Sequence, residues 1–524
     1  MRESNVNMSL FGNGDSSFAP SDGVKLHFHA YRYFAYEKQL ALRELTRITG
    51  ALNFEELGAG LYVRDPVDLA GLKSLTYFAG VTTQAGEFPT VQHELEESHR
   101  RVAGLGNRQS TRYSVHGLHE YKGRFNPQIA RFLLNYLGSN RKTKVLDPFC
   151  GSGTTIIESA LGGIQAVGID ANPLAVFLCN AKLKALAIPA DEIGASLELV
   201  LRSLTRRSEH MPSWVPSDSR LSYLKKWFPL ETLILLERLR GSIAKKGGQA
   251  ESVLLSLVSD LLREYSLQEP SDLRIRRRIS PFPSEPLLHA LKKKADAFVR
   301  NLRASQAITG LLDVNCRALV GDSRRTDEVG QRSSHPRYYD LVITSPPYAT
   351  ALPYIDTQRL SLIWLGLTSV EDLRSLEAFA VGSREFGRNA INWDARLQEN
   401  TDGLPDSLAT LCHTLRKALR PEDGFRRRAT PMLIYRYFAE MRQVFAGLRS
   451  VLRSGARLAF VVGANHTTLG GQTFRIDSAE SLANIAEHLG FRIAEVLRLE
   501  TYQRYGLHQK NSINTENLTI LEWH

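Results

Sequence analysis

Hydrophobic and polar positions along the chain follow two patterns, one typical of buried strands and one typical of helices. A helical pattern at 126–138 leads into the short apolar run 144–147, and another helix, strand and helix follow up to residue 187. Strands and helices that alternate at this spacing predict a parallel sheet with helices on both of its faces.

The alternation stops after residue 187 and resumes much later. Only helical patterns occur between about 188 and 310. Strand patterns then return at 315–323 and 340–345, and three more follow a long helix near the end of the chain, at 456–465, 491–499 and 517–523. We therefore predict an α/β fold, a doubly wound, seven-stranded, Rossmann-like sheet that is interrupted by a helical insertion.

These patterns divide the chain into three expected parts. Residues 1–110 read as a loose tail and a small α/β accessory domain, with a strand at 27–34, a helix at 69–81 and a linker at 87–110. Residues 111–190 and 311–524 form the expected catalytic domain. Residues 191–310 form an inserted basic helical region.

Composition narrows the class of protein. Hydrophobic residues make up 43% of the 524 positions and charged residues 23%, which suits a chain that buries a core. No run approaches the roughly 18 apolar residues of a membrane span, and no secretory signal is evident at the N-terminus. The four cysteines lie far apart, without the spacing of a zinc site. We expect a cytoplasmic protein without membrane contact, disulfides or a bound metal.

A glycine-rich turn at 145–159 joins a strand to a helix. No lysine follows Gly153, as a phosphate-binding P-loop requires, and position 156 is Ile where a dinucleotide fingerprint needs glycine. Asp147 ends the strand, and its carboxylate suits a cationic ligand. Asp170 ends the next strand, where a carboxylate can accept both ribose hydroxyls. Together these features predict S-adenosylmethionine as the cofactor, the alternative being a purely structural turn.

The segment DPFCGSGT resembles motif I of the amino-methyltransferases, which methylate exocyclic amines of nucleic-acid bases. GIDANP at 168–173 resembles motif II of these enzymes, GDS at 321–323 motif III, and HEYKGRFNP at 119–127 motif X. The resemblance implies a methionine site that includes Phe125, a ribose contact from Asp170 and an adenine contact from Asp322. It implies that the methionine end is lined by Asp147, Phe149, Gly151 and Gly153.

The tetrapeptide Ser345-Pro346-Pro347-Tyr348 follows another apolar strand. The prolines hold the backbone rigid, so that the Ser345 hydroxyl and nearby carbonyl oxygens can accept both N–H groups of an exocyclic amine and free its lone pair for methyl transfer. Tyr348 offers a flat face to a base flipped out of a duplex. In the resembling family, SPPY favours cytosine N4 over adenine N6, although the chemistry itself does not force this choice.

The net charge of 66 − 55 = +11 suits a polyanion, and double-stranded DNA is the expected partner. The insertion falls between motifs II and III, which departs from the resembling family and leaves its role open: its basic clusters fit either a phosphate clamp or solvated helix faces. Two loops, 381–393 and 504–512, are further candidates for contact with the nucleic acid. The basic clusters of the insertion are Arg206, Arg207, Lys225, Lys226, Arg238, Arg240, Lys245, Lys246, Arg274–Arg278 and Lys292–Lys294.

Two other functions compete with DNA methylation. The glycine turn also resembles motif I of tRNA and rRNA guanine-N2 methyltransferases, but those usually carry Asn or Asp where Ser345 stands. RNA is therefore the less favoured substrate. A DNA-binding scaffold without catalysis is the third reading, which the complete set of motifs disfavours. A restriction or defence partner would fit the leading hypothesis.

Overall fold

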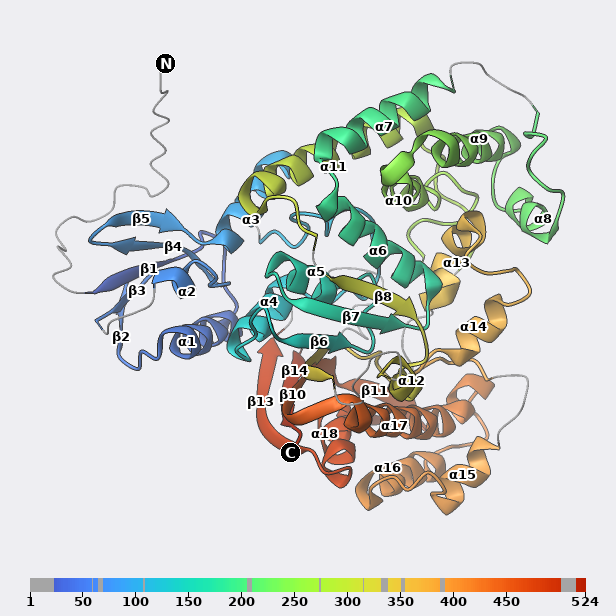
Figure 1. The fold of residues 1–524 in the computed structure, drawn as a ribbon. Helices are drawn as coiled ribbons and strands as arrows, with labels where there is room; N and C mark the ends of the chain where they lie inside the picture. Colours follow the sequence, from blue (N-terminus) through green and yellow to red (C-terminus); the bar gives the residue numbers. More distant parts are fainter. Residues whose placement is uncertain are drawn as a thin grey trace.

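The computed structural model describes residues 23–58, 60–64, 69–106, 109–204, 210–272, 275–313, 315–330, 338–349, 354–386, 392–500 and 515–524. Three parts are visible in the ribbon: a central sheet, a helical layer above it and a small N-terminal sheet at one side (Figure 1).

The central sheet contains seven strands, in the order β13-β14-β10-β9-β6-β7-β8. The five strands from β10 to β8 run parallel to one another, and β14 runs antiparallel to both β10 and β13. The predicted doubly wound, seven-stranded α/β sheet is confirmed. Its strands are β6 (Lys144–Asp147), β7 (Gln165–Asp170), β8 (Cys316–Val320), β9 (Tyr339–Thr344), β10 (Leu452–Gly463), β13 (Arg492–Glu500) and β14 (Thr515–Glu522).

Helices cover both faces of this sheet because successive strand residues point to opposite faces. Val145 packs with α4 (Pro127–Tyr136) and α5 (Thr154–Leu161), whereas its neighbour Leu146 packs with α17 (Phe425–Val451) and α18 (Ser478–His488). α6 (Pro173–Ala187) lies beside α5 on the first face. The short apolar run KVLD therefore anchors two layers at once.

The predicted helical insertion consists of α7 (Ala190–Arg202), α8 (Ser219–Lys225), α9 (Leu230–Lys246), the 3-10 turn η1 (Gly248–Ala250), α10 (Glu251–Leu261) and α11 (Leu287–Thr309). It forms the upper layer in Figure 1. Its apolar side chains share one continuous core with α6 and with α13 (Tyr354–Leu365). The insertion therefore packs as an extension of one helical layer of the central sheet.

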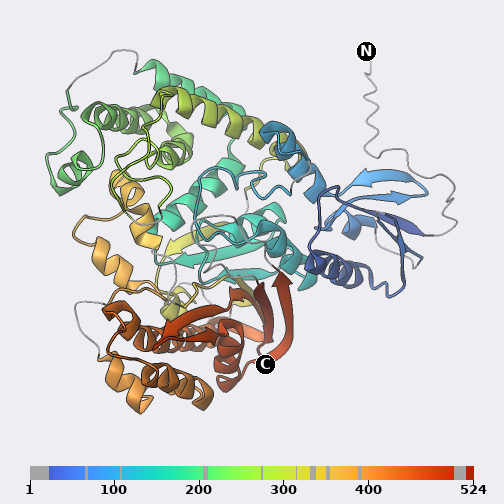
Figure 2. The ribbon, with the colours of Figure 1, turned by 180° about the vertical axis from the view of Figure 1, so that it is seen from behind.

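The N-terminal part is a five-stranded antiparallel sheet in the order β2-β3-β1-β4-β5. α1 (Ala35–Thr49) joins it to α4 of the main sheet (Figure 2). Buried Glu44 stabilises this contact, since its carboxylate accepts hydrogen bonds from Thr76 and, at 2.7 Å, from the Asn135 amide. The strands are β1 (Val24–Phe28), β2 (Phe54–Leu57), β3 (Gly60–Val63), β4 (Phe78–Thr83) and β5 (Gly86–Pro89).

Three predictions for this part are wrong. The strand expected at 27–34 lies at 24–28, and the helix expected at 69–81 is only α2 (Leu69–Leu72), with β4 following. The expected linker at 87–110 instead contains helix α3 (Val91–Ala103), whose first turn is capped by the Thr90 side chain. α3 is rich in charge, but its buried Glu96 and Gln92 hydrogen-bond to each other, and α3 packs against α11. Tertiary contacts thus override its polar composition.

The remaining described elements lie in the second half of the chain. They are η2 (Ser323–Arg325), α12 (Thr326–Gly330), α14 (Leu373–Phe379), α15 (Trp393–Glu399), α16 (Asp406–Lys417), β11 (Asn465–Leu469) and β12 (Gln472–Ile476). Within the described residues, only the strongly bent pair of α6 and α7 has the length and composition of a membrane span, and that pair belongs to the buried core described above.

Candidate active site

Four of the predicted site segments meet at one edge of the sheet. Asp147 ends β6, Asp170 ends β7, Asp322 follows β8 and Ser345 follows β9. These strands are adjacent and parallel, so their carboxyl ends lie side by side, which is where open α/β sheets bind ligands. The fold therefore brings together residues that are up to 198 positions apart in sequence (345 − 147).

The glycine-rich turn adopts a backbone conformation that requires glycine. Gly151 and Gly153 have φ values of 50° and 90°, in the left-handed region. A Cβ at Gly153 would also lie 2.3 Å from the Cys179 Sγ of α6. The turn thus lies directly against α6, and α5 begins at the next residue.

Asp170 is hydrogen-bonded to the glycine-rich turn and to the loop that follows β7. Its Oδ2 accepts a hydrogen bond from the Gly151 N–H at 2.9 Å, and its Oδ1 accepts one from the Asn172 N–H at 2.8 Å. Burial raises the pKa of this carboxyl to about 6. A carboxylate has about four acceptor positions, so acceptor capacity remains for a ligand hydroxyl.

Asp147 connects the ends of two neighbouring strands. Its Oδ1 accepts hydrogen bonds from the Thr344 hydroxyl at 2.6 Å and from the Phe149 N–H at 3.1 Å. Burial raises the pKa of the Asp147 carboxyl to about 6 as well. Because Thr344 immediately precedes Ser345, this contact ties the glycine turn to the SPPY segment.

The segment that resembles motif X lies beside the same turn. The Phe125 carbonyl accepts a hydrogen bond from the Thr154 hydroxyl at 3.3 Å, and the half-buried Phe125 ring packs into the core around α4. Tyr121 lies closer to the turn, since its Cε1 is 3.5 Å from the position of a Cβ on Gly151. The Tyr121 hydroxyl accepts a hydrogen bond from Asn172 at 3.4 Å. Sequence reasoning did not single out Tyr121.

Asp322 is held by an arginine. Its Oδ1 accepts hydrogen bonds from the Arg324 Nε at 2.8 Å and from the Arg324 backbone N–H at 3.0 Å. Arg324 also donates to Glu440 of α17 at 2.9 Å and to the carbonyl of Phe379 in α14. Through Arg324, Asp322 is thus connected to α17 and α14, a connection that the sequence did not reveal.

The SPPY segment is fixed by three contacts with other strands. The Ser345 hydroxyl donates to the Val461 carbonyl of β10 at 3.1 Å, and the Tyr348 hydroxyl donates to Glu516 of β14 at 2.5 Å. The Asn465 side-chain amide donates to the Ala349 carbonyl at 2.6 Å. Sequence reasoning missed Glu516 and Asn465. The only signal was that each is a polar residue at the end of an apolar strand.

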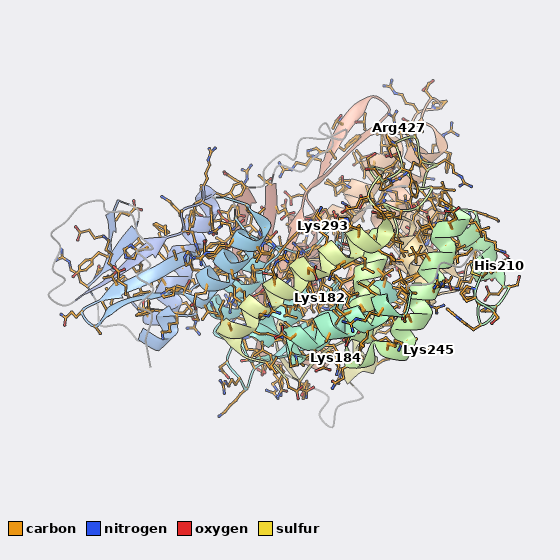
Figure 3. All side chains as sticks on the ribbon, turned by 90° about the horizontal axis from the view of Figure 1, so that it is seen from above. Lys182, Lys184, His210, Lys245, Lys293 and Arg427 are labelled. Carbon is orange, nitrogen blue, oxygen red and sulfur yellow. The ribbon has the colours of Figure 1, made fainter. Side chains whose placement is uncertain are left out.

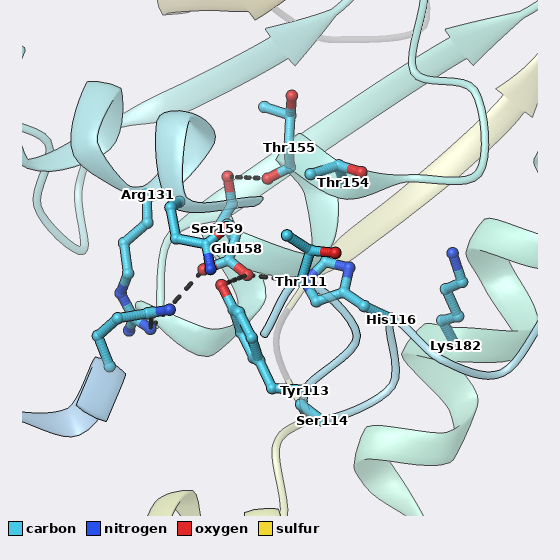
Figure 4. A network of polar contacts seen from close by, with 12 residues as sticks. Thr111, Tyr113, Ser114, His116, Arg131, Thr154, Thr155, Glu158, Ser159 and Lys182 are labelled. Carbon is cyan, nitrogen blue, oxygen red and sulfur yellow. Dashed lines mark hydrogen bonds and ion pairs between the residues drawn. The ribbon is translucent and has the colours of Figure 1, made fainter. Parts of the chain in front are cut away.

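Buried polar residues lie around α5, the helix that follows the glycine turn (Figure 4). Glu158 of α5 accepts from the Tyr113 hydroxyl at 2.8 Å and lies 2.7 Å from the Nε2 of His116. On the other side of the turn, buried Lys182 donates to the Ser152 carbonyl at 2.8 Å. Burial lowers the pKa of this lysine to about 7. Lys182 thus holds the turn directly, and the Glu158 contacts hold the segment 113–116 against α5.

The expected nucleic-acid surfaces are described only in part. Arg206, Arg207, Arg274, Arg388 and the loop 504–512 lie outside the described residues. Lys292 and Lys294 form ion pairs with Glu198 and Asp260. Lys225, Lys226, Arg276 and Arg277 are described and exposed, and they remain candidates.

Comparisons with known proteins give the class of the protein. Residues 118–200 match the family described as UPF0020, RMKL-like, methyltransferase domain. The chain is 22% identical over 427 residues to the Type II methyltransferase M.BsoBI of Geobacillus stearothermophilus, covering 75% of this chain and 81% of that one. Over 50 residues, 10% of this chain and 15% of the relative, it is 42% identical to a tRNA (guanine(10)-N2)-dimethyltransferase of Methanothermobacter thermautotrophicus.

The solved structure of TrmN from Thermus thermophilus is also similar, with a TM-score of 0.32 and 11% identity over 96% of this chain and 99% of that one. The seven-stranded α/β sheet and the sequence relatives both indicate a methyltransferase. The chain is a methyltransferase, and S-adenosylmethionine is its methyl donor.

Proposed function

We propose that this methyltransferase acts on DNA and transfers the methyl group to an exocyclic amine of a flipped base, the N4 of cytosine. The observation that carries the proposal is the hydrogen bond from the Ser345 hydroxyl to the Val461 carbonyl. Because the hydroxyl proton is already donated, the lone pairs of Ser345 Oγ are left to accept. An acceptor at this place suits an amine N–H.

The neighbouring residues fit the same substrate. Tyr348 is half-buried, and Glu516 fixes its hydroxyl, so its ring has a defined orientation beside Ser345. Asn465 holds the backbone at Ala349. A rigid aromatic face and a fixed acceptor orient a planar base and its amine, and such positioning lowers the barrier to attack.

The cofactor side of the edge fits S-adenosylmethionine, which supplies an electrophilic methyl group on a sulfonium. We assign the ribose to Asp170 and the methionine end to Asp147, Gly151 and Gly153. The buried carboxylates favour a cationic ligand, and the positive φ of the two glycines leaves backbone without a Cβ beside it. We also assign Phe125 and Phe149 to the methionine end and Asp322 to the adenine end.

The extent of the similarities supports DNA over RNA. The alignment with the Type II methyltransferase spans 75% of the chain, whereas the alignment with the tRNA enzyme spans 10%. An alignment of 50 residues is too short to support a shared substrate. A restriction endonuclease that cuts the same sequence is the partner this proposal implies.

Cytosine N4 rests on the resemblance of SPPY to the cytosine enzymes, and adenine N6 is the second candidate, because a hydroxyl can accept an N–H of either base. In both reactions Ser345 and Tyr348 perform the same tasks. Guanine-N2 methylation of RNA is the third candidate, favoured by the resemblance of the glycine turn to those enzymes and by the short match to the tRNA enzyme.

The test is methyl transfer from labelled S-adenosylmethionine to unmethylated bacterial DNA and, in parallel, to unmodified tRNA and rRNA, with the nucleosides identified by mass spectrometry. We expect N4-methylcytosine in DNA. N6-methyladenine in DNA would overturn the choice of base, and label found only in RNA would overturn the choice of nucleic acid.

A further inference from the structure

A basic hairpin connects α10 to α11 within the helical insertion. Its two arms pair through the Glu269 N–H, which donates to the Arg276 carbonyl at 2.9 Å, and the Arg278 N–H, which donates to the Leu267 carbonyl at 2.8 Å. The Leu267 N–H also donates to the Trp227 carbonyl at 2.7 Å, which attaches the hairpin to the end of α8.

The hairpin carries Arg276 and Arg277 on its exposed side, whereas Arg278 is half-buried and donates to the Gln268 and Glu264 carbonyls. The Arg277 guanidinium stacks 4.6 Å from the centre of the Trp227 ring and donates to the Lys226 carbonyl at 2.5 Å. Arg276 is 64% exposed, and Lys225 and Lys226 are exposed beside it. These contacts hold the cations of α8 and of the hairpin on one continuous ridge.

The charge balance of this ridge is positive. Five cationic residues compare with four carboxylates nearby, those of Asp272, Glu264, Glu269 and Asp356, the last of which pairs with Arg359. Asp272 pairs with Arg276 at 3.0 Å, whereas Glu269 is occupied by the backbone N–H groups of Ile279 and Ser280. The cations are Lys225, Lys226, Arg276, Arg277 and Arg278.

The tip of the hairpin reaches the element that follows SPPY. The Ile275 N–H donates to the Asp356 carboxylate of α13 at 3.3 Å. Asp356 lies eight residues after Tyr348, and a chain of that length spans at most about 28 Å. One turn of B-DNA is about 34 Å, so Asp356, which the hairpin contacts, lies within one turn of a base held at Tyr348. In Figure 1, α13 lies beside the ends of β7 and β8, below α9 and α10.

We propose that this ridge, formed by the end of α8 and the hairpin arms 266–272 and 275–280, binds the phosphates of the DNA duplex beside the target base. The inference rests on the proposed function and adds the surface by which the substrate is held. Phosphate contacts of this kind give affinity and register without reading sequence. The ridge is therefore a positioning surface, and base recognition belongs to other residues.

Other basic residues of the insertion and of α6 fit this role less well. Lys292 pairs with Glu198, and Arg303 pairs with Asp191. Lys184 and Lys245 lie along one edge of the helical layer in Figure 3. Along α9, Lys246 lies about 24 Å from the end near α8, given a rise of 1.5 Å per residue.

The experiment compares two triple variants of the full chain. The ridge variant is Lys225→Gln, Lys226→Gln, Arg276→Gln, and the matched control is Lys184→Gln, Lys245→Gln, Lys246→Gln. Both remove three positive charges from exposed positions, those of the control being on α6 and α9. Binding to a labelled 30-base-pair duplex of arbitrary sequence is measured by fluorescence anisotropy between 50 and 300 mM salt, because the phosphate term does not depend on sequence.

Each lost phosphate contact lowers the salt slope of log K by about 0.9, so the ridge variant should lose about 2.7 in slope. At 150 mM salt this corresponds to affinity about 100-fold weaker, and the control variant should keep the wild-type slope. Equal slopes for the ridge variant and the wild type would overturn the proposal, and so would an equal loss in the control variant.

Two further measurements separate this proposal from the proposed function. Calorimetric titration with S-adenosylmethionine should give the same affinity for both variants and the wild type, which shows that the fold is intact. If the wild type methylates DNA while the ridge variant binds DNA normally, only the ridge is refuted. If the wild type methylates RNA alone and the ridge variant loses RNA binding instead, the DNA assignment fails for both proposals.

Discussion

Replacement of Ser345 by alanine tests the catalytic assignment. The Ser345 hydroxyl donates to the Val461 carbonyl, so its lone pairs are the fixed acceptors next to Tyr348. Ser345→Ala removes this acceptor and leaves the cofactor side of the edge unchanged. Asp147 and Asp170 make their hydrogen bonds with Thr344 and with backbone N–H groups.

The structure sets the size of the effect. Removal of one preorganised hydrogen-bonding group from an active site typically costs about 100- to 1,000-fold in kcat, or about 2.7–4 kcal/mol. The lost hydrogen bond to Val461 is a single, partly exposed contact, and its net value for stability is about 1 kcal/mol. The variant should therefore fold and bind S-adenosylmethionine, yet transfer methyl groups at no more than about 1% of the wild-type rate.

The assay is single-turnover methyl transfer to DNA, with calorimetry of S-adenosylmethionine binding as the control. Ser345→Thr keeps a hydroxyl that can donate to the same carbonyl and should retain most of the rate. A Ser345→Ala enzyme that turns over at the wild-type rate, or that no longer binds S-adenosylmethionine while the Thr variant does, would refute the role given to this hydroxyl.

Three further predictions follow from the same contacts. Glu516→Ala should lower kcat about tenfold, the value of one hydrogen bond, whereas Glu516→Gln keeps an acceptor and should keep the rate. In a Tyr348→Phe background Glu516→Ala should cause no further loss, and additive losses would contradict the coupling between Tyr348 and Glu516. Because burial raises the pKa of Asp147 and Asp170 to about 6, both carboxyls are protonated below that pH. Calorimetry should therefore show weaker S-adenosylmethionine binding as the pH falls below 6, and proton release on binding near pH 6. Constant affinity from pH 5 to 8 would contradict this. Burial lowers the pKa of Lys182 to about 7, so above pH 7 the unfolded chain binds more protons than the folded chain. In urea unfolding, the free energy of unfolding of the wild type should therefore rise by up to about 1.4 kcal/mol per pH unit relative to Lys182→Met between pH 7 and 9. A difference that stays constant with pH would refute this.

The sheet and its site were predictable from sequence because both depend on local signals and on one rule of topology. Short apolar runs marked the strands, and a carboxylate or serine at the end of each run marked the residues that meet at the edge. Parallel strands place their carboxyl ends together, so the meeting of Asp147, Asp170, Asp322 and Ser345 required no knowledge of distant contacts.

The missed features all depend on contacts between distant positions. Tyr348 and Glu516 are 168 residues apart, and Arg324 and Glu440 are 116 apart. No periodicity along the chain encodes such pairs. Helix α3 was missed for a related reason, since its polar residues are satisfied by buried hydrogen bonds, as with Gln128 donating to Glu96 at 3.1 Å.

The most direct test of the central claim uses a bacterial host whose own DNA methyltransferases have been deleted. The wild-type chain and its Ser345→Ala variant are expressed to equal levels, and the host DNA is digested to nucleosides for mass spectrometry. The account predicts N4-methylcytosine in DNA from cells with the wild type, and a strongly reduced amount with the variant. DNA without any methylated cytosine or adenine, together with newly methylated host RNA, would contradict it.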